Sequence, residues 1–127
     1  MSEARPFSYA VLRVVPCLER GERLNVGLAL FCRQFDFLEL RTNLDRGRLA
    51  VIAPELDPAP VEERLNAIRR VIEGDAAAGP LARLDLSERF GWLTAPSSTI
   101  IQSSETHTGL TRDPAAELDR LFKSLVL

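Results

Sequence analysis

The 127-residue chain has few of the side chains that bind metal ions or form disulfide bonds. Cys17, Cys32 and His107 are its only cysteines and its only histidine. A structural zinc site needs four such ligands in closely spaced pairs, so these three residues do not supply one. No charged segment followed by an apolar stretch opens the chain, which favours a cytoplasmic protein with reduced thiols. The sequence therefore predicts neither a metal site nor a cofactor.

A long hydrophobic run and an excess of basic residues are also missing. The longest uncharged apolar run, from Val26 to Cys32, is far shorter than the roughly 20 residues of a membrane-spanning helix. The formal net charge of -2 argues against a dedicated nucleic-acid-binding protein, which normally carries a strong basic excess. Hydrophobic residues make up 46% and charged residues 27%, as in soluble globular proteins. We expect one domain over residues 1–127 that binds neither membranes nor nucleic acid.

The first third of the chain has the residue pattern of β-strands. Residues 7–15 are β-branched, aromatic and apolar on both faces, as in a central strand. In residues 24–33, larger apolar side chains alternate with smaller groups, which predicts a core side and a side open to close approach. The core side carries Leu24, Val26, Leu28, Leu30 and Cys32, and the other carries Asn25, Gly27, Ala29 and Phe31. The sequence predicts an antiparallel sheet of about four strands, over residues 7–15, 24–33, 35–41 and 99–103.

Helices are predicted in most of the remaining chain. Asp57-Pro58 and Asp113-Pro114 are typical helix starts, and apolar residues at helical spacing follow each of them. The predicted helices cover residues 45–53, 58–73, 86–94 and 114–126, although a strand remains an alternative for residues 45–53. Trp92 is expected to fill the core, the alternative being an exposed anchor for a partner. The expected fold class is α+β, with the helices mainly on the core side of residues 24–33.

Two blocks of the sequence carry a family resemblance that extends over nearly the whole chain. The first comprises residues 9–16 (YAVLRVVP) and 20–27 (RGERLNVG). The second comprises residues 89–93 (RFGWL), the hydroxyl-rich segment up to Thr108, and residues 113–122 (DPAAELDRLF). These blocks resemble bacterial proteins of the domain of unknown function 3037 family, apart from Cys17, where an acidic or polar residue is expected. No activity is assigned to that family, so the resemblance implies no reaction. Its genes can lie beside those of Hip-type serine/threonine kinases, which implies such a kinase as a partner.

Nucleophilic catalysis is one interpretation of the hydroxyl-rich segment between Thr94 and Thr111, because this segment contains His107. Such catalysis needs a base within hydrogen-bond reach of the nucleophile and a third group that orients the base. The sequence has no G-x-S-x-G motif and no glycine-rich phosphate-binding loop. A small enzyme with a polar Arg/Ser/Thr/His cleft, acting on an anionic substrate, is therefore the alternative function.

Arg13 is the residue whose position most needs an explanation. It lies in the middle of a predicted central strand, where a buried guanidinium must be paired. Asn25 is on the small-residue side of the next strand, Glu22 lies in the preceding turn, and Gln102 and His107 belong to the late polar segment. The sequence predicts that these residues form a polar cluster. This cluster is either an internal ion pair, from Arg13 to Glu22 or another acid, or a site for a ligand or peptide. We expect a non-catalytic binding or regulatory module.

Overall fold

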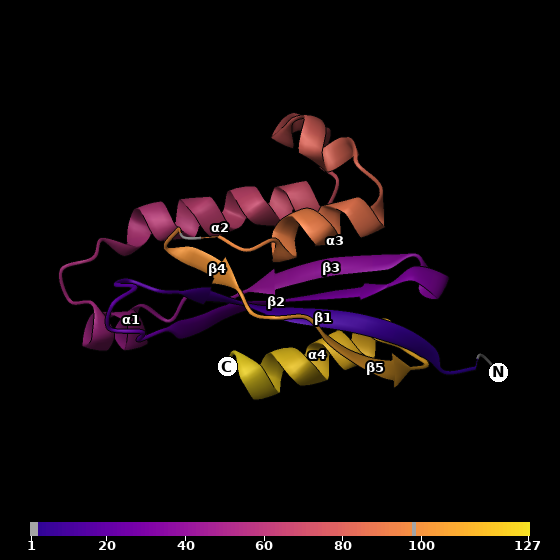
Figure 1. Cartoon of the computed structure of the whole chain (residues 1–127), viewed down its shortest axis with the longest axis horizontal. Coiled ribbons are helices and arrows are strands. Elements are labelled where there is room, and N and C mark those ends of the chain that lie inside the picture. Colours follow the sequence, from indigo (N-terminus) through magenta and orange to yellow (C-terminus); the bar gives the residue numbers. More distant parts are fainter. Residues whose placement is uncertain (1–2, 98) are drawn as a thin grey trace.

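The protein folds into an open antiparallel sheet with helices on both faces (Figure 1). This computed structural model describes residues 3–97 and 99–127. Within these residues the sheet has the strand order β3-β2-β1-β4, and β5 pairs with the same edge of β1 as β4 does. The strands are β1 (Arg5–Val14), β2 (Leu24–Cys32), β3 (Phe37–Thr42), β4 (Ile101–Ser103) and β5 (His107–Thr111). The helices are α1 (Arg46–Ile52), α2 (Pro58–Ile72), α3 (Leu86–Thr94) and α4 (Pro114–Leu125), with short 3-10 turns η1 (Arg33–Phe35), η2 (Ala76–Ala78) and η3 (Pro80–Arg83).

The predicted α+β class is confirmed, and the four predicted helices form close to their expected bounds. The ambiguous segment 45–53 contains α1, because the Asp45 carboxylate accepts a hydrogen bond from the Arg48 backbone N–H and caps the helix. Asp57 and Asp113 cap α2 and α4 in the same way. None of the helices in the described residues is both long and apolar enough to cross a membrane.

The strand β5 was not predicted, so the sheet has five strands where the sequence predicted about four. Its residues, HTGLT, lack the alternation of apolar and polar side chains that identifies a strand. β5 forms because the first half of β1 offers it a backbone partner, with Phe7 directly opposite Gly109. The Phe7 ring fills the space beside this glycine, since a Cβ atom at Gly109 would lie 2.8 Å from the ring. Tertiary pairing, rather than local sequence, therefore makes this strand.

The sheet is sandwiched between two helical layers. α2 and α3 cover one face, and α4 covers the other (Figure 1). The buried residues accordingly form two hydrophobic clusters, one on each face of the sheet. The cluster beside α2 and α3 contains Leu12, Ala29 and Leu40, whereas the cluster beside α4 contains Leu28 and Leu30. Both faces of the central strands are therefore core.

The prediction that Leu24, Val26, Leu28 and Leu30 share one helix-covered face is wrong, because β2 contains an irregularity. Leu12 pairs with Gly27 and Arg13 pairs with Asn25, so Val26 is an extra residue between the two pairs. Such a bulge reverses the alternation of side chains along the strand. Leu24 and Val26 consequently pack on the side of α2, while Leu28 and Leu30 pack on the side of α4. The supposed open face is also filled, since the side chains of Leu12 and Leu40 lie against Gly27.

Candidate functional site

Three of the predicted site residues lie in one row across the sheet. Arg13 in β1 has Asn25 of β2 as its partner on one side and Gln102 of β4 on the other. Directly opposed residues of antiparallel strands point to the same face. Val11, two residues before Arg13, belongs to the cluster beside α4, so alternation places the whole row on the α4 face.

The amide side chains of this row make hydrogen bonds away from Arg13. Asn25 Nδ2 donates to the Leu125 carbonyl at 3.0 Å and so holds the last turn of α4 on the sheet. A carbonyl at a helix end has no partner within the helix, which is why an amide donor is useful there. Gln102 Nε2 donates to the Thr99 carbonyl at 3.0 Å. The row is therefore a set of neighbours rather than a closed hydrogen-bonded network.

Glu22 is engaged elsewhere. Its carboxylate accepts a hydrogen bond from Arg20 Nε, two residues earlier in the same exposed turn. This ion pair lies at the surface, where both side chains are in contact with solvent. Arg20 is therefore not a candidate ligand-binding residue. No ion pair joins Glu22 to Arg13 in the part of the chain that the structure describes.

Arg13 itself is half-buried and has no acid partner. Its Nε atom is buried without a hydrogen-bond acceptor, and the guanidinium forms no ion pair within residues 3–97 and 99–127. A guanidinium removed from water without an acceptor is energetically costly. Arg13 is thus a cationic group whose hydrogen-bonding capacity is not used by the fold.

Glu105 is a site residue that the sequence analysis did not identify. A hydrogen bond from its own backbone N–H, together with the nearby positive charge of Arg13, holds the pKa of this carboxyl below its usual value. Glu105 is thus close enough to Arg13 for their charges to interact, without an ion pair between them in the described part of the chain. One feature of the sequence could have identified it, because Glu105 is the only acidic residue between Pro96 and Arg112.

His107, in β5, lies at the outer edge of the sheet face that carries Arg13 and Gln102. It lies opposite Tyr9 across the β1–β5 pair, and the two rings stack with their centroids 5.2 Å apart. In the described residues the His107 ring makes no hydrogen bond to a hydroxyl or a carboxylate, so no base–nucleophile pair is formed there. We call Tyr9, Arg13, Gln102 and His107 the arginine face, with Glu105 at its border.

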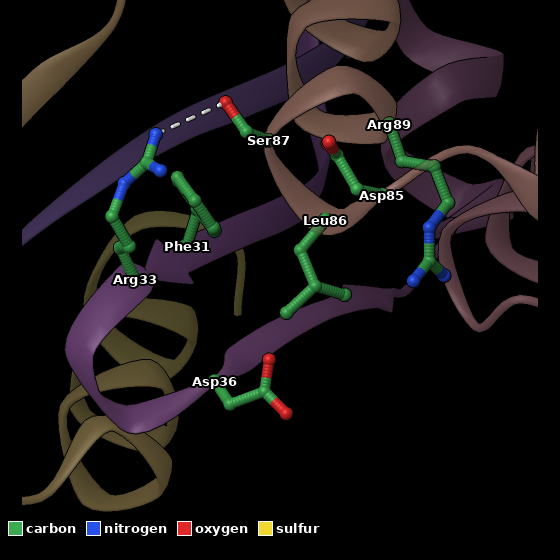
Figure 2. A pocket seen from close by; sticks show the side chains of 7 residues that line it. All are labelled: Phe31, Arg33, Asp36, Asp85, Leu86, Ser87 and Arg89. Atoms are coloured by element: carbon green, nitrogen blue, oxygen red, sulfur yellow. Dashed lines mark hydrogen bonds between the residues drawn. The ribbon is translucent and has the colours of Figure 1, made fainter.

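A polar depression of about 440 Å³ lies elsewhere, between η1 and the start of α3 (Figure 2). Its lining residues are Phe31, Arg33, Asp36, Asp85, Leu86, Ser87 and Arg89, none of which the sequence analysis selected. Figure 2 shows Arg33 reaching Ser87 on one side of Leu86 and Arg89 extending away on the other. The question is whether these charges are available to a ligand.

Two of the charged residues in this depression, Asp85 and Arg89, form hydrogen bonds that stabilise helix ends. Asp85 caps α3 through the Glu88 backbone N–H, and this hydrogen bond lowers the pKa of the Asp85 carboxyl, as do the charges of Arg33 and Arg89. Arg89 Nη1 donates to the Ile72 carbonyl at 2.6 Å and so satisfies the end of α2, although among the described residues its buried Nε, like that of Arg13, has no acceptor. We therefore interpret this depression as a helix junction, and the arginine face as the better candidate site.

Comparison with known proteins gives a family but no activity. No curated protein and no solved structure matches the chain significantly. A family model does match, over residues 9–126, which is nearly the whole chain and includes the entire arginine face. The resemblance noted from the two sequence blocks is thereby confirmed. The chain belongs to the family described as Protein of unknown function (DUF3037).

Proposed function

We propose that this protein is a non-catalytic binding module that holds an anionic group of its ligand or partner at Arg13. The observation that supports this proposal is the state of the Arg13 side chain, which is half-buried, positively charged and, among the residues that the structure describes, without an acid partner. Arginine presents a planar fork of donors that matches carboxylate and phosphate groups. An anion bound here would supply the acceptor that the fold does not.

The surroundings of Arg13 favour recognition of a ligand rather than a reaction. The stacked rings of Tyr9 and His107 provide a partly apolar surface farther along β1 on the same face of the sheet. Glu105 supplies a competing negative charge that a ligand anion must approach. The alternative, a small enzyme acting on an anionic substrate, has no specific observation in its favour, because His107 has no hydroxyl or carboxylate partner among the described residues.

Replacing Arg13 by glutamine should weaken anion binding about tenfold or more without unfolding the protein. Titration of the ¹⁵N-labelled protein with inorganic phosphate, and separately with acetate, should shift the amide signals of β1 and β4 in the native chain. The shifts should largely disappear in Arg13→Gln. Stability should change by less than about 1 kcal/mol, because no hydrogen-bond partner is stranded.

Arg120→Gln is the matched control, since Arg120 is an exposed arginine that already donates to Glu117 at 2.8 Å. It should bind the anions as the native protein does. Glu105→Gln should bind them more tightly, because the competing charge is removed. Equal shifts in the native and Arg13→Gln proteins would exclude Arg13 as the site. A loss of about 3–5 kcal/mol in Arg13→Gln would instead indicate a structural role.

The family resemblance adds a partner class to this proposal, namely a Hip-type serine/threonine kinase. We expect the protein and a co-encoded kinase of this type, expressed together from one operon, to co-purify on a tag placed on either chain. Size-exclusion chromatography at micromolar concentration should then give one peak that contains both chains. Two separate peaks under these conditions would contradict the kinase partnership, while the anion titration would still test Arg13 independently.

A further inference from the structure

A groove of about 250 Å³ lies between α2, α3 and β4, on the face of the sheet opposite to the arginine face. Its floor is apolar and belongs to the hydrophobic core. Four buried residues form it: Leu12, Ile68, Leu93 and Ile101. The helices α2 and α3 form the walls above the sheet (Figure 1). The segment between α3 and β4 completes the lining, so the groove is open to solvent and combines an apolar floor with a polar rim, as small-molecule sites often do.

Trp92 and Arg64 give this groove its chemical character. Trp92 is half-buried, so one part of the indole packs against the core while another part lines the groove. Arg64 is exposed on α2 and also lines the groove. Within residues 3–97 and 99–127, the indole N–H of Trp92 and the guanidinium of Arg64 have no hydrogen-bond partner, and Arg64 forms no ion pair.

The described hydroxyl groups at the groove already have partners, with Ser97 Oγ and Thr99 Oγ1 2.8 Å apart. Thr99 Oγ1 donates to the Ile101 carbonyl at 2.9 Å, and Ser103 Oγ donates to the Ser104 carbonyl at 2.8 Å. Among the described lining residues, the side-chain donors left for a bound molecule are therefore those of Arg64 and Trp92. The side chains of arginine and tryptophan can donate hydrogen bonds but cannot accept them. The part of a ligand that contacts them must therefore carry a hydrogen-bond acceptor.

We propose that this groove binds a small amphipathic carboxylate. Its apolar tail would lie on Leu12 and Ile101 beneath the Trp92 ring, and its carboxylate would accept hydrogen bonds from Arg64. Burial of the tail supplies the hydrophobic contribution, and the planar guanidinium suits a carboxylate. The groove is smaller than the roughly 300–1,000 Å³ of pockets for drug-sized ligands, so the occupant is a short-chain or single-ring acid.

Trp92 provides a direct reporter, because it is the only tryptophan of the chain. We suggest a titration with hexanoate that follows the Trp92 fluorescence of the full chain. The native protein should show a saturable change at millimolar concentrations or below. Arg64→Gln should weaken the binding about tenfold or more, and the uncharged analogue hexanamide should bind the native protein correspondingly weakly.

Arg70→Gln is the matched control, since Arg70 is an exposed arginine on the same helix that does not line the groove. It should bind hexanoate as the native protein does. An unchanged fluorescence in the native protein, or an equal response in Arg64→Gln and Arg70→Gln, would overturn the proposal. A response lost in Arg13→Gln but kept in Arg64→Gln would also overturn it and would assign hexanoate to the arginine face. Thermal melts of all variants establish that each is folded.

Discussion

Replacing Leu28 by alanine should lower the free energy of unfolding by about 3–4 kcal/mol. Leu28 is 0% exposed and lies in the cluster between the sheet and α4, beside Leu30 and Leu118. Its truncation removes buried apolar surface and leaves a cavity, because strands on both sides prevent β2 from moving inward. Urea denaturation with linear extrapolation measures the loss, and an unchanged slope would show that the native fold persists.

Two further variants calibrate this result. Val51→Ala should change the stability by no more than about 0.5 kcal/mol, because Val51 is 82% exposed in α1. Leu24→Ala should give an intermediate loss, since Leu24 is only partly buried near the start of β2. Near-zero losses for both Leu28→Ala and Leu24→Ala would contradict the packing of β2 between the two helical layers.

Gly27→Val should lower the free energy of unfolding by about 3 kcal/mol, even though valine has the higher β-propensity. A Cβ atom at Gly27 would lie 3.1 Å from the Arg41 carbonyl oxygen and 3.4 Å from Leu12 Cβ. Both atoms belong to neighbouring strands of the sheet, so neither can move away without disturbing the backbone pairing. The two additional methyl groups of valine would enter a space that Leu40 already occupies.

Alanine substitutions at two glycines provide the comparison for this effect. Gly27→Ala should destabilise less than Gly27→Val, because only the Cβ atom has to be accommodated. Gly91→Ala in α3 should instead stabilise the protein by about 0.5–1 kcal/mol, since no atom lies within 4 Å of the added Cβ and alanine favours the helix. A Gly27→Val variant more stable than the native protein would mean that this side of β2 is open to water.

The helices could be predicted because their signals are local. Asp57 and Asp113 precede proline in the sequence, and in the structure each carboxylate caps the helix that follows. The side of the sheet to which each β2 residue points could not be predicted in this way. Residues on both faces of β2 are apolar or small, so the same sequence is compatible with a regular strand and with a strand that bulges at Val26. The bulge depends on pairing with β1.

In the candidate site, too, features that depend on neighbouring residues could be predicted, and features that depend on tertiary packing could not. Asn25 lies opposite Arg13 because a short turn joins β1 to β2, whereas Gln102 reaches the row only through the long-range pairing of β4 with β1. The hydrogen bond from Asn25 to Leu125 was not predictable, because it depends on where α4 docks. Glu105 was overlooked because its influence on Arg13 arises across the sheet rather than along the chain.

The position of β1 in the sheet has a consequence for the order in which the protein can fold during synthesis. β1 is made before the other strands, yet β4 and β5, which complete one of its edges, are made only after α1, α2 and α3, and α4 follows them. Until then Leu28 and Leu30 lack their helical cover, and half of the hydrogen-bonding groups of β1 lack partners. Contacts between such distant parts of a chain slow folding. The nascent protein therefore presents a bare sheet surface and an open strand edge to the cell for most of its synthesis, which is the condition that chaperones act upon.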